Sequence, residues 1–332
     1  MTYTKNNRKN RKQYTKNNRF SNQIVSNSNT NINNSSNNAS TRLGRMNCSP
    51  AVNGRTPLKD TCYTSDILVK IKDAYNQSHS NDQILATLSK DIWSELHNKM
   101  QNCEKEDCWL EQIKDPNMRK QIDEIVFAPD QPPEWKSNPD EWLSNFDIAA
   151  VLKQYERTYP EFKLLGPSSI DYDTRLPEEG DKCVWDELCH LSLAKLKKKG
   201  KTKLGISFNL DKHDDPGSHW VSMFVDLDNA LIYYYDSALN PVPSEINRLK
   251  EEIQNQGSML NPPINFQYIK NTKDHQKTNT ECGMYSLFFI ITFLTGETDF
   301  NKNMTIKQKI KLFSNKNIPD KYVQKYRKIY FN

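Results

Sequence analysis

Apolar side chains recur at helical spacing in several segments of the chain after about residue 60. Segment 64–77 places four of them on one stripe behind a Thr or Ser cap, which predicts an amphipathic helix. The stripe consists of Ile67, Leu68, Ile71 and Tyr75. Segment 282–296 is apolar on every side, which predicts a buried helix that ends at Gly296. Further helices are predicted at 81–100, 106–113, 117–127, 142–160, 183–200 and 243–256.

Runs rich in β-branched and aromatic residues predict a sheet in the second half of the chain. These predicted strands are 203–210, 219–226, 230–237 and 265–271. A mixed sheet packed around the central apolar helix gives a fold of the α+β class. Segment 128–142 contains four prolines in fifteen residues, which predicts a linker or a wrapping loop. We therefore divide the chain into a tail at 1–45, a helical N-terminal region at 46–135 and a main domain at 136–332.

The formal net charge of +5 is unevenly distributed. Residues 1–59 contain eleven Lys or Arg and no Asp or Glu. Positions 1–45 are dominated by Asn, Ser, Lys and Arg, and such a segment buries too little apolar surface to offset the entropy of ordering. We predict a disordered basic tail. It is either a solvated arm or an arm that binds nucleic acid or an acidic partner through non-specific electrostatics.

Neither a membrane span nor a secretory signal is predicted. The longest apolar run, 284–294, is about half of the roughly 20 residues that a bilayer-spanning helix requires, and the first twenty residues lack the apolar stretch of a signal peptide. The seven cysteines include no Cys-x-x-Cys pair, so we expect a reducing compartment and mostly free thiols. Cys183, Cys189 and His190 lack the paired spacing of zinc sites, so we expect helix residues there and no metal.

A predicted hairpin at 217–238 carries a histidine at one end and a carboxylate at the other. With a tight turn at 226–229, His219 directly opposes Asp236, and the Cβ atoms of such a pair lie roughly 4.5 to 5.5 Å apart. A hydrogen bond at that spacing fixes the tautomer of a catalytic histidine and stabilises its protonated form. The alternative is an ordinary polar pair in a sheet. His213 lacks a following Trp and has no opposed acid in this register.

Cys282 stands at the predicted N-terminus of the buried apolar helix. Helix-end amides and a neighbouring imidazolium both favour a thiolate, so Cys282 is a candidate nucleophile. Acyl transfer through a thiolate creates an oxyanion, and Gln276 together with the backbone N–H of Cys282 can donate to it. The alternatives are a small core residue at position 282 and a solvated Gln at 276.

The order of these residues resembles that of the SUMO proteases and the adenovirus-type cysteine proteases. His-Trp at 219–220, then Asp236, then Gln-x5-Cys-Gly at 276–283 match the catalytic order of both groups. The resemblance implies a papain-like core, in which a mixed sheet packs on the buried helix that carries the Cys, and it implies no cofactor. The implied roles are general base for His219, orienting acid for Asp236, oxyanion donor for Gln276 and nucleophile for Cys282.

The segment Trp-Leu-Ser-Asn-Phe-Asp-Ile at 142–148 is similar to the one that opens the SUMO-protease domain. The resemblance implies that Trp142 and Trp220 form a narrow tunnel over the glycines of the substrate, with Asn145 at the same binding site. The chain departs from the SUMO enzymes by a Ser at 144 in place of Asn and by Asn145 in place of Asp. This difference bears on the recognition of a folded ubiquitin-like modifier.

Segments 47–50, 61–76 and 162–173, together with 142–148, resemble the processing proteases of large cytoplasmic DNA viruses. The resemblance implies an endopeptidase that cuts core or capsid precursors after small residues, typically glycine, in the virion and the host cytoplasm. One alternative is a protease that removes SUMO or ubiquitin from host conjugates. Another is an interaction protein with a decayed protease domain that binds virion nucleic acid or core protein.

Overall fold

The computed structural model of the protein describes residues 43–332, which belong to one compact unit that begins at Thr41. The predicted tail, 1–45, lies outside the described residues except for its last three positions. Among residues 43–332, every helix is too short or too polar to cross a membrane. The boundaries predicted at 45 and 135 stay predictions.

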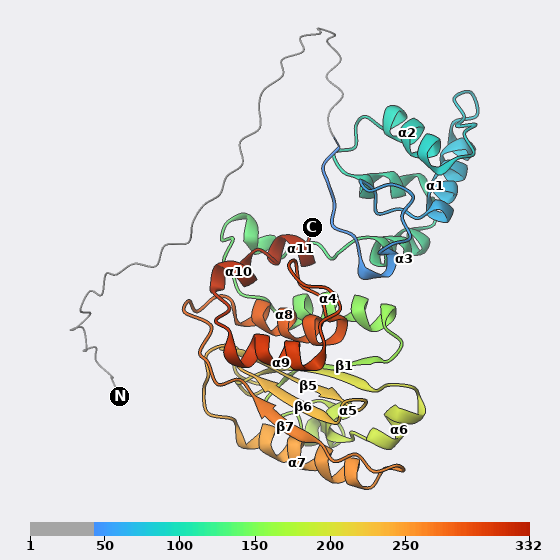
Figure 1. Ribbon diagram of the computed structural model, residues 1–332. Coiled ribbons are helices and arrows are strands. Elements are labelled where there is room, and N and C mark those ends of the chain that lie inside the picture. The colour runs from blue at the N-terminus through green and yellow to red at the C-terminus, as the bar shows by residue number, and fades with distance from the viewer. Residues whose placement is uncertain (1–42) are drawn as a thin grey trace, which may run out of the picture. The chain divides into compact units, whose positions relative to one another are not determined.

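The first part of the described chain is helical and has a core of its own (Figure 1). Its elements are η1 (Pro50–Val52), α1 (Ser65–Ser78), α2 (Ser89–Lys99), η2 (Glu106–Gln112) and α3 (Pro116–Val126). The ring of Tyr63 stacks on Trp109 and meets the edge of Phe127, with centroid separations of 5.9 and 5.3 Å. All three rings are almost wholly buried, so they form the centre of this core.

The helix predicted at 81–100 is wrong in its first half. Only Ser89–Lys99 is helical. Asn76 replaces the missing helical hydrogen bonds, because its side chain accepts from the N–H of Ile84 at 2.7 Å and donates to the carbonyl of the same residue at 2.9 Å. Leu85 and Leu88 are 81 and 67% exposed, so their helical spacing did not reflect burial.

The helix predicted at 183–200 is also wrong as one element. The structure divides this segment into a short strand and two short helices. They are β3 (Lys182–Cys183), α5 (Asp186–Cys189) and α6 (Leu193–Lys198), and β3 pairs with β2 (Arg175–Leu176), which precedes η4 (Pro177–Glu179). The side chain of Ser192 accepts the N–H of Lys195 and so begins a new helix where the pattern predicted a continuous one.

The expectation of mostly free thiols is wrong for six of the seven cysteines. The structure joins them in three disulfides: Cys48–Cys62, Cys103–Cys108 and Cys183–Cys189. The ligand atoms of Cys183, Cys189 and His190 lie within 4.8 Å of one another, but the disulfide occupies both sulfurs. Spacing along the chain did not reveal these pairs, because each depends on how the chain folds back. Among residues 43–332 only Cys282 is free.

A five-stranded mixed sheet forms the centre of the second part, and the predicted α+β class is confirmed. Its order is β1–β4–β5–β6–β7, with parallel pairs β1–β4 and β6–β7 and antiparallel pairs between the others. The strands are β1 (Phe162–Ser169), β4 (Lys203–Asn209), β5 (Trp220–Asp226), β6 (Leu231–Tyr235) and β7 (Gln267–Lys270). Strand β1 was not predicted. It contains Pro167, which an edge strand tolerates and a central strand does not.

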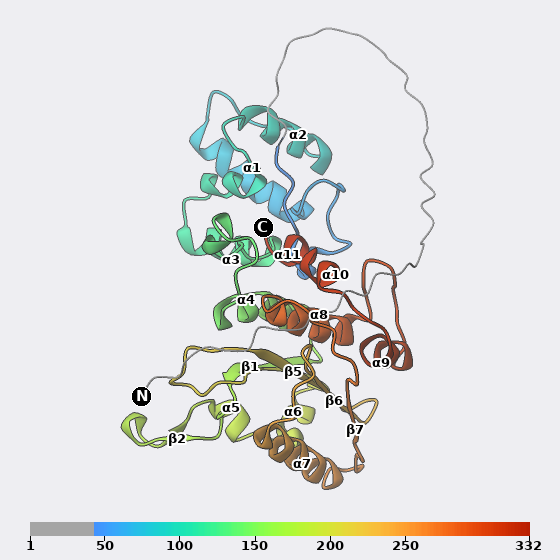
Figure 2. The same ribbon diagram turned by 90° about the vertical axis from the view of Figure 1, so that its left-hand side faces the viewer.

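Helices cover both faces of this sheet (Figures 1 and 2). One face carries α4 (Asn145–Thr158) and α8 (Cys282–Thr295). The short helix η3 (Pro133–Lys136) precedes α4 in the chain. The other face carries α5, α6 and α7 (Ser244–Ser258). The C-terminal helices α9 (Ile306–Asn315), α10 (Asp320–Gln324) and α11 (Arg327–Tyr330) lie on the α8 side. The sheet is therefore the middle layer of three.

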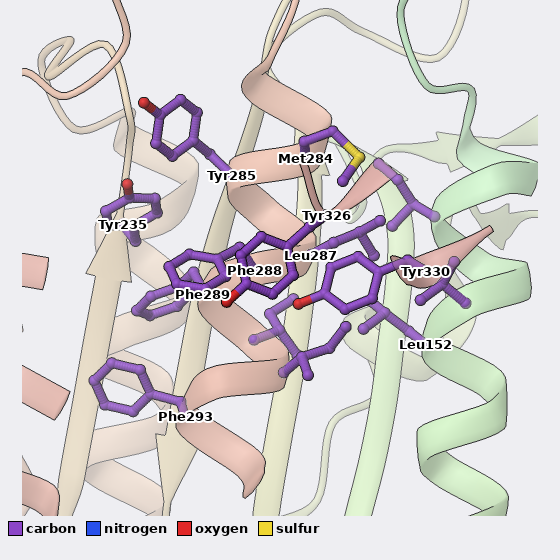
Figure 3. Close-up of a cluster of buried hydrophobic side chains, with 14 of the residues drawn as sticks. Leu152, Tyr235, Met284, Tyr285, Leu287, Phe288, Phe289, Phe293, Tyr326 and Tyr330 are labelled. Atoms are coloured by element: carbon purple, nitrogen blue, oxygen red, sulfur yellow. The ribbon is translucent and has the colours of Figure 1, made fainter. Parts of the chain in front are cut away.

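Helix α8 is buried along almost its whole length, as its all-round apolar sequence predicts. Every residue from Cys282 to Leu294 is buried. Phe289 and Phe293 contact Tyr233 of the sheet, whereas Phe288 contacts Tyr326 of the C-terminal segment (Figure 3). This packing fixes the axis of α8, and with it the position of the cysteine at its first turn.

Candidate active site

The hairpin β5–β6 brings His219 and Asp236 together at one end of the sheet. His219 directly precedes β5 and Asp236 directly follows β6, and Nε2 of the histidine lies 2.6 Å from Oδ1 of the aspartate. The predicted register is wrong by two residues, because Asp226 pairs with Leu231 around a four-residue turn. A shift of two keeps every side chain on its own face of the sheet, so the pair still meets, diagonally instead of directly.

Asp236 is held by main-chain donors as well as by the histidine. The N–H groups of Ala238 and Asn240 donate to its two carboxylate oxygens at 2.9 and 2.8 Å. The side chain of Asn271 accepts the N–H of Asp236 at 3.1 Å and donates to its carbonyl. Burial alone raises the pKa of this carboxyl, but the hydrogen bonds from His219 and the main chain hold the pKa below its usual value.

Cys282 is the first residue of α8 and is 2% exposed. Nε2 of His219 binds Asp236, and Cys282 lies close enough to His219 to influence its pKa. Burial lowers the pKa of His219, yet these two partners outweigh burial and raise the pKa from 6.5 to about 9. The raised pKa makes the imidazole a stronger acceptor for the proton of Cys282, the one free thiol among residues 43–332.

Gln276 lies beside the end of β6. Its side-chain oxygen accepts the hydroxyl of Ser237 at 2.7 Å, and its amide nitrogen donates to the carbonyl of Thr278 at 2.7 Å. The backbone N–H groups of His275 and Gln276 both donate to the carbonyl of Ser237 at 2.9 Å. These bonds tie the loop before Cys282 to the residue that follows Asp236.

Trp142, Asn145 and Trp220 line one cavity of about 520 Å³. The indole N–H of Trp220 donates to the carbonyl of Leu143 at 2.9 Å, which ties β5 to the segment before α4. Gly283 lets this segment approach the nucleophile's helix, because a Cβ there would lie 3.0 Å from the Cβ of Leu143. The structure thus places all three predicted substrate-binding residues along one cleft.

Ser144, one of the two departures from the SUMO-protease pattern, has a structural role at the start of α4. Its side chain accepts the N–H of Asp147, and the carboxylate of Asp147 accepts the N–H of Ser144 at 2.8 Å. This reciprocal arrangement is a capping box, which stabilises the first turn of a helix.

A buried ion pair lies immediately before the nucleophile, and sequence analysis missed it. Nε of Arg327 donates to Oε2 of Glu281 at 3.1 Å, and the two side chains are only 6 and 2% exposed. Arg327 also donates to the carbonyl of Glu141 at 2.9 Å and stacks on Trp135, 4.4 Å from the ring centroid. Arg327 stands in a lysine-rich stretch without a motif, so no local signal in the sequence marks it.

A second histidine–carboxylate pair lies close by, and its acid comes from outside the hairpin. Nδ1 of His213 lies 2.7 Å from Oδ2 of Asp171, and the N–H of His213 donates to the other carboxylate oxygen at 3.0 Å. Asp171 follows β1, the strand that was not predicted, so this partner could not be inferred from the hairpin.

A free thiol at the start of a buried helix, a histidine–aspartate pair beside it and a mixed sheet behind it are typical of cysteine peptidases. The chain is an enzyme of this class.

Residues 203–331 match the Ulp1 protease family, C-terminal catalytic domain. It is 29% identical over 261 residues to a candidate thiol protease of Acanthamoeba polyphaga mimivirus, covering 72% of this chain and 82% of the relative. It is 28% identical over 223 residues to a cysteine protease of African swine fever virus, covering 61% and 79%. Sequences from three other isolates of that virus are named SUMO-1 cysteine proteases.

The fold is also similar to that of a solved structure. The crystal structure of the African swine fever virus protease superposes with a TM-score of 0.56 at 21% identity, over 86% of this chain and 95% of that one. Because the match extends over most of both chains, the shared fold includes the helical N-terminal part as well as the sheet.

Proposed function

We propose that the protein is an endopeptidase in which Cys282 is the nucleophile, His219 the general base and acid, Asp236 the orienting acid and Gln276 an oxyanion donor. The observation that supports this assignment is the 2.6 Å bond between His219 and Asp236, together with a free thiol, Cys282, close enough to raise the pKa of the same imidazole. Asp236 binds Nε2, which leaves Nδ1 for the thiol.

Proton transfer from Cys282 to His219 gives a thiolate and an imidazolium, and the thiolate attacks the scissile carbonyl carbon. A carbon–sulfur bond forms and the carbonyl electrons move to oxygen. When the carbon–nitrogen bond breaks, His219 gives its proton to the leaving amine. Water then attacks the thioester with His219 as base, which releases the acid and restores the thiol.

The oxyanion has two donors close to the sulfur. The N–H of Cys282 belongs to the first turn of α8, where helical N–H groups have no partner within the helix. The amide of Gln276 uses one N–H on Thr278, and its second N–H has no protein partner among the described residues. Preorganised donors of this kind are each worth about 10²–10³ in kcat.

For the substrate, we propose proteins cut after small residues, with Gly-Gly-type sites, and core or capsid precursors as the natural targets. Two large rings, Trp142 and Trp220, line the cleft. This lining supports a substrate that is flat and unbranched next to the scissile bond, as glycines are. We further propose a role in virion maturation, in the virion and the host cytoplasm, because the relatives are viral proteases. Detection of the protein in purified particles tests that location.

The first experiment is labelling with a peptide electrophile that ends in Gly-Gly, followed by mass spectrometry of the modified cysteine. Because the other six cysteines are paired, we expect labelling at Cys282 alone and its loss in Cys282→Ala. Cys282→Ala should also abolish cleavage of a Gly-Gly peptide while leaving the thermal transition unchanged. Turnover retained by Cys282→Ala would refute the assignment.

A second candidate function is the removal of SUMO or ubiquitin from conjugates, because African swine fever virus relatives bear the name SUMO-1 cysteine protease. A folded modifier requires contacts beyond the cleft, whereas a short peptide does not. We therefore propose to compare kcat/KM on a folded SUMO conjugate with kcat/KM on the matching Gly-Gly peptide. A preference for the folded conjugate of more than about tenfold would favour this candidate.

We also propose that the basic tail binds nucleic acid, on the evidence of its nine positive and no negative charges over residues 1–45. A non-specific contact of this kind weakens steeply with salt. Deleting residues 1–42 should therefore reduce salt-sensitive DNA binding. Unchanged DNA binding after the deletion would refute a nucleic-acid-binding role for the tail.

A further inference from the structure

A basic cavity of about 680 Å³ lies where the start of the described chain meets its C-terminal helices. Its basic lining residues come from three separate parts of the chain. They are Arg45, Lys105, Lys321, Lys325, Arg327 and Lys328. The only carboxylate side chain in the lining is Asp140, which accepts a hydrogen bond from Gln324. The main-chain oxygen of Asn332 is bound by the N–H of Gln131 at 3.0 Å.

Four of these six cations have no carboxylate partner among residues 43–332. Lys325 pairs with Asp299 and Arg327 with Glu281, but the structure gives no ion pair to the others. Those four are Arg45, Lys105, Lys321 and Lys328, and all are exposed. Like charges gathered in a concave site repel one another, and an anionic ligand offsets that repulsion.

The aromatic side chains of the basic cavity are already engaged. Trp135 is 7% exposed, Arg327 stacks on its ring, and Phe331 meets it edge-on at 5.2 Å. Single-stranded nucleic acid is usually held by bases stacked on exposed rings, and the basic cavity offers no such ring. The chemistry therefore favours recognition of charge alone.

A compact polyphosphate fits these constraints better than a longer polyanion. The volume lies within the range of about 300–1,000 Å³ typical of small-molecule sites. Each phosphate group carries roughly 1.5 to 2 negative charges and three acceptor oxygens, so two or three groups neutralise four cations. An acidic peptide spreads a similar charge over a flexible chain and would have to order more residues to do so.

We propose that the basic cavity binds a compact polyphosphate, meaning several phosphate groups on a small scaffold, through Arg45, Lys105, Lys321 and Lys328. The lining of the basic cavity does not include Cys282 and shares no residue with the cavity of Trp142 and Trp220. It shares Arg327 with the loop before the nucleophile, since Arg327 holds Glu281. The proposal does not depend on the proposed substrate.

Calorimetric titration of the full chain with inositol hexakisphosphate and with inorganic tripolyphosphate, at physiological salt, tests the proposal. We expect one site per chain and a loss of affinity of at least tenfold in Lys321→Ala/Lys328→Ala. The matched control is Lys198→Ala/Lys199→Ala, which removes the same charge from exposed lysines on α6 and just after it. The control should change the affinity less than twofold.

Three results would overturn the proposal. They are the absence of saturable binding, an equal loss of affinity in both double variants, and binding of a poly-glutamate peptide as tight as that of the polyphosphates. Equal affinity for tripolyphosphate and adenosine triphosphate would support recognition of phosphate alone. Tighter binding of adenosine triphosphate would show that the cavity also contacts the base, and it would refute recognition of phosphate alone. Thermal melting of each variant checks that it is folded.

Discussion

Two histidine–carboxylate pairs lie near the catalytic end of the sheet, and their contacts are almost identical. The nitrogen–oxygen distance is 2.6 Å for His219–Asp236 and 2.7 Å for His213–Asp171. Their surroundings differ. The side chains of the first pair are 14 and 1% exposed, and those of the second are 35 and 9% exposed.

The comparison shows that the hydrogen bond alone does not make a catalytic base. Both pairs raise the pKa of the histidine. Only His219 also lies beside the thiol of Cys282, and only Asp236 is held by the side chain of Asn271. The nearby thiol, the Asn271 side chain and the deeper burial distinguish the two pairs, since solvent screens the more exposed one.

The largest expected effect comes from removing each histidine. His219→Ala should lower kcat/KM for a Gly-Gly peptide by about 10²–10⁴ because the proton acceptor is lost. It should also slow the alkylation of Cys282 by iodoacetamide at least tenfold. His213→Ala should change the alkylation rate less than twofold, since this small reagent does not require the substrate cleft. Equal slowing in both variants would contradict the difference between the pairs.

Replacing the carboxylate partner of each histidine tests whether the acid of each pair affects catalysis. Asp236→Asn should reduce kcat by about tenfold or more, because the amide no longer stabilises the imidazolium. KM should change little, since Asp236 does not line the cleft. Asp171→Asn should leave the alkylation rate of Cys282 within twofold. A change in KM without a change in kcat for Asp236→Asn would argue for a structural role instead.

The pH dependence of the unfolding free energy isolates the contribution of His219. Folding raises the pKa of His219 from 6.5 to about 9, so the folded state binds this proton more tightly than the unfolded state. The resulting stability is complete below pH 6.5 and is lost as the pH rises through about 9. We expect the unfolding free energy to fall over that interval, whereas kcat/KM should fall only as the pH passes about 9, where the folded protein loses this proton. His219→Ala should remove this part of the stability profile, whereas His213→Ala should retain it.

The smallest expected effect concerns the support behind Asp236. Asn271→Ala leaves the N–H and the carbonyl of Asp236 without their side-chain partner, and unsatisfied buried groups cost about 1–3 kcal/mol. Urea denaturation measures this loss. Thr272→Ala, which removes a neighbouring hydrogen bond to the carbonyl of Ser314 away from the active site, is the matched control for activity. We expect kcat to fall a few-fold only in Asn271→Ala.

Local patterns predicted the elements that bury one continuous face. The apolar run of α8 and the strands β4, β5 and β6 were placed within a few residues, because burial dictates every side chain in them. The His219–Asp236 contact was predicted despite a wrong register, because a two-residue shift preserves the face. The motif order, in turn, selected the class of enzyme.

Features that depend on distant parts of the chain escaped prediction. Asn271, Arg327 and the Asp171 partner of His213 come from segments that only the fold brings to the site. The disulfides escaped for the same reason. Leu85 and Leu88 caused the opposite error. Their helical spacing predicted a buried helical stripe, but both side chains are exposed.

The ion pair between Arg327 and Glu281 has a consequence for the timing of activity during protein synthesis. The two residues are 46 positions apart, with the arginine later in the chain. A nascent chain that has emerged only as far as Phe313 has all four proposed catalytic residues, but the carboxylate beside the nucleophile still lacks its cation. We therefore expect the thiol to be correctly aligned only after the ribosome has delivered the last helices, which delays proteolysis until the domain is complete.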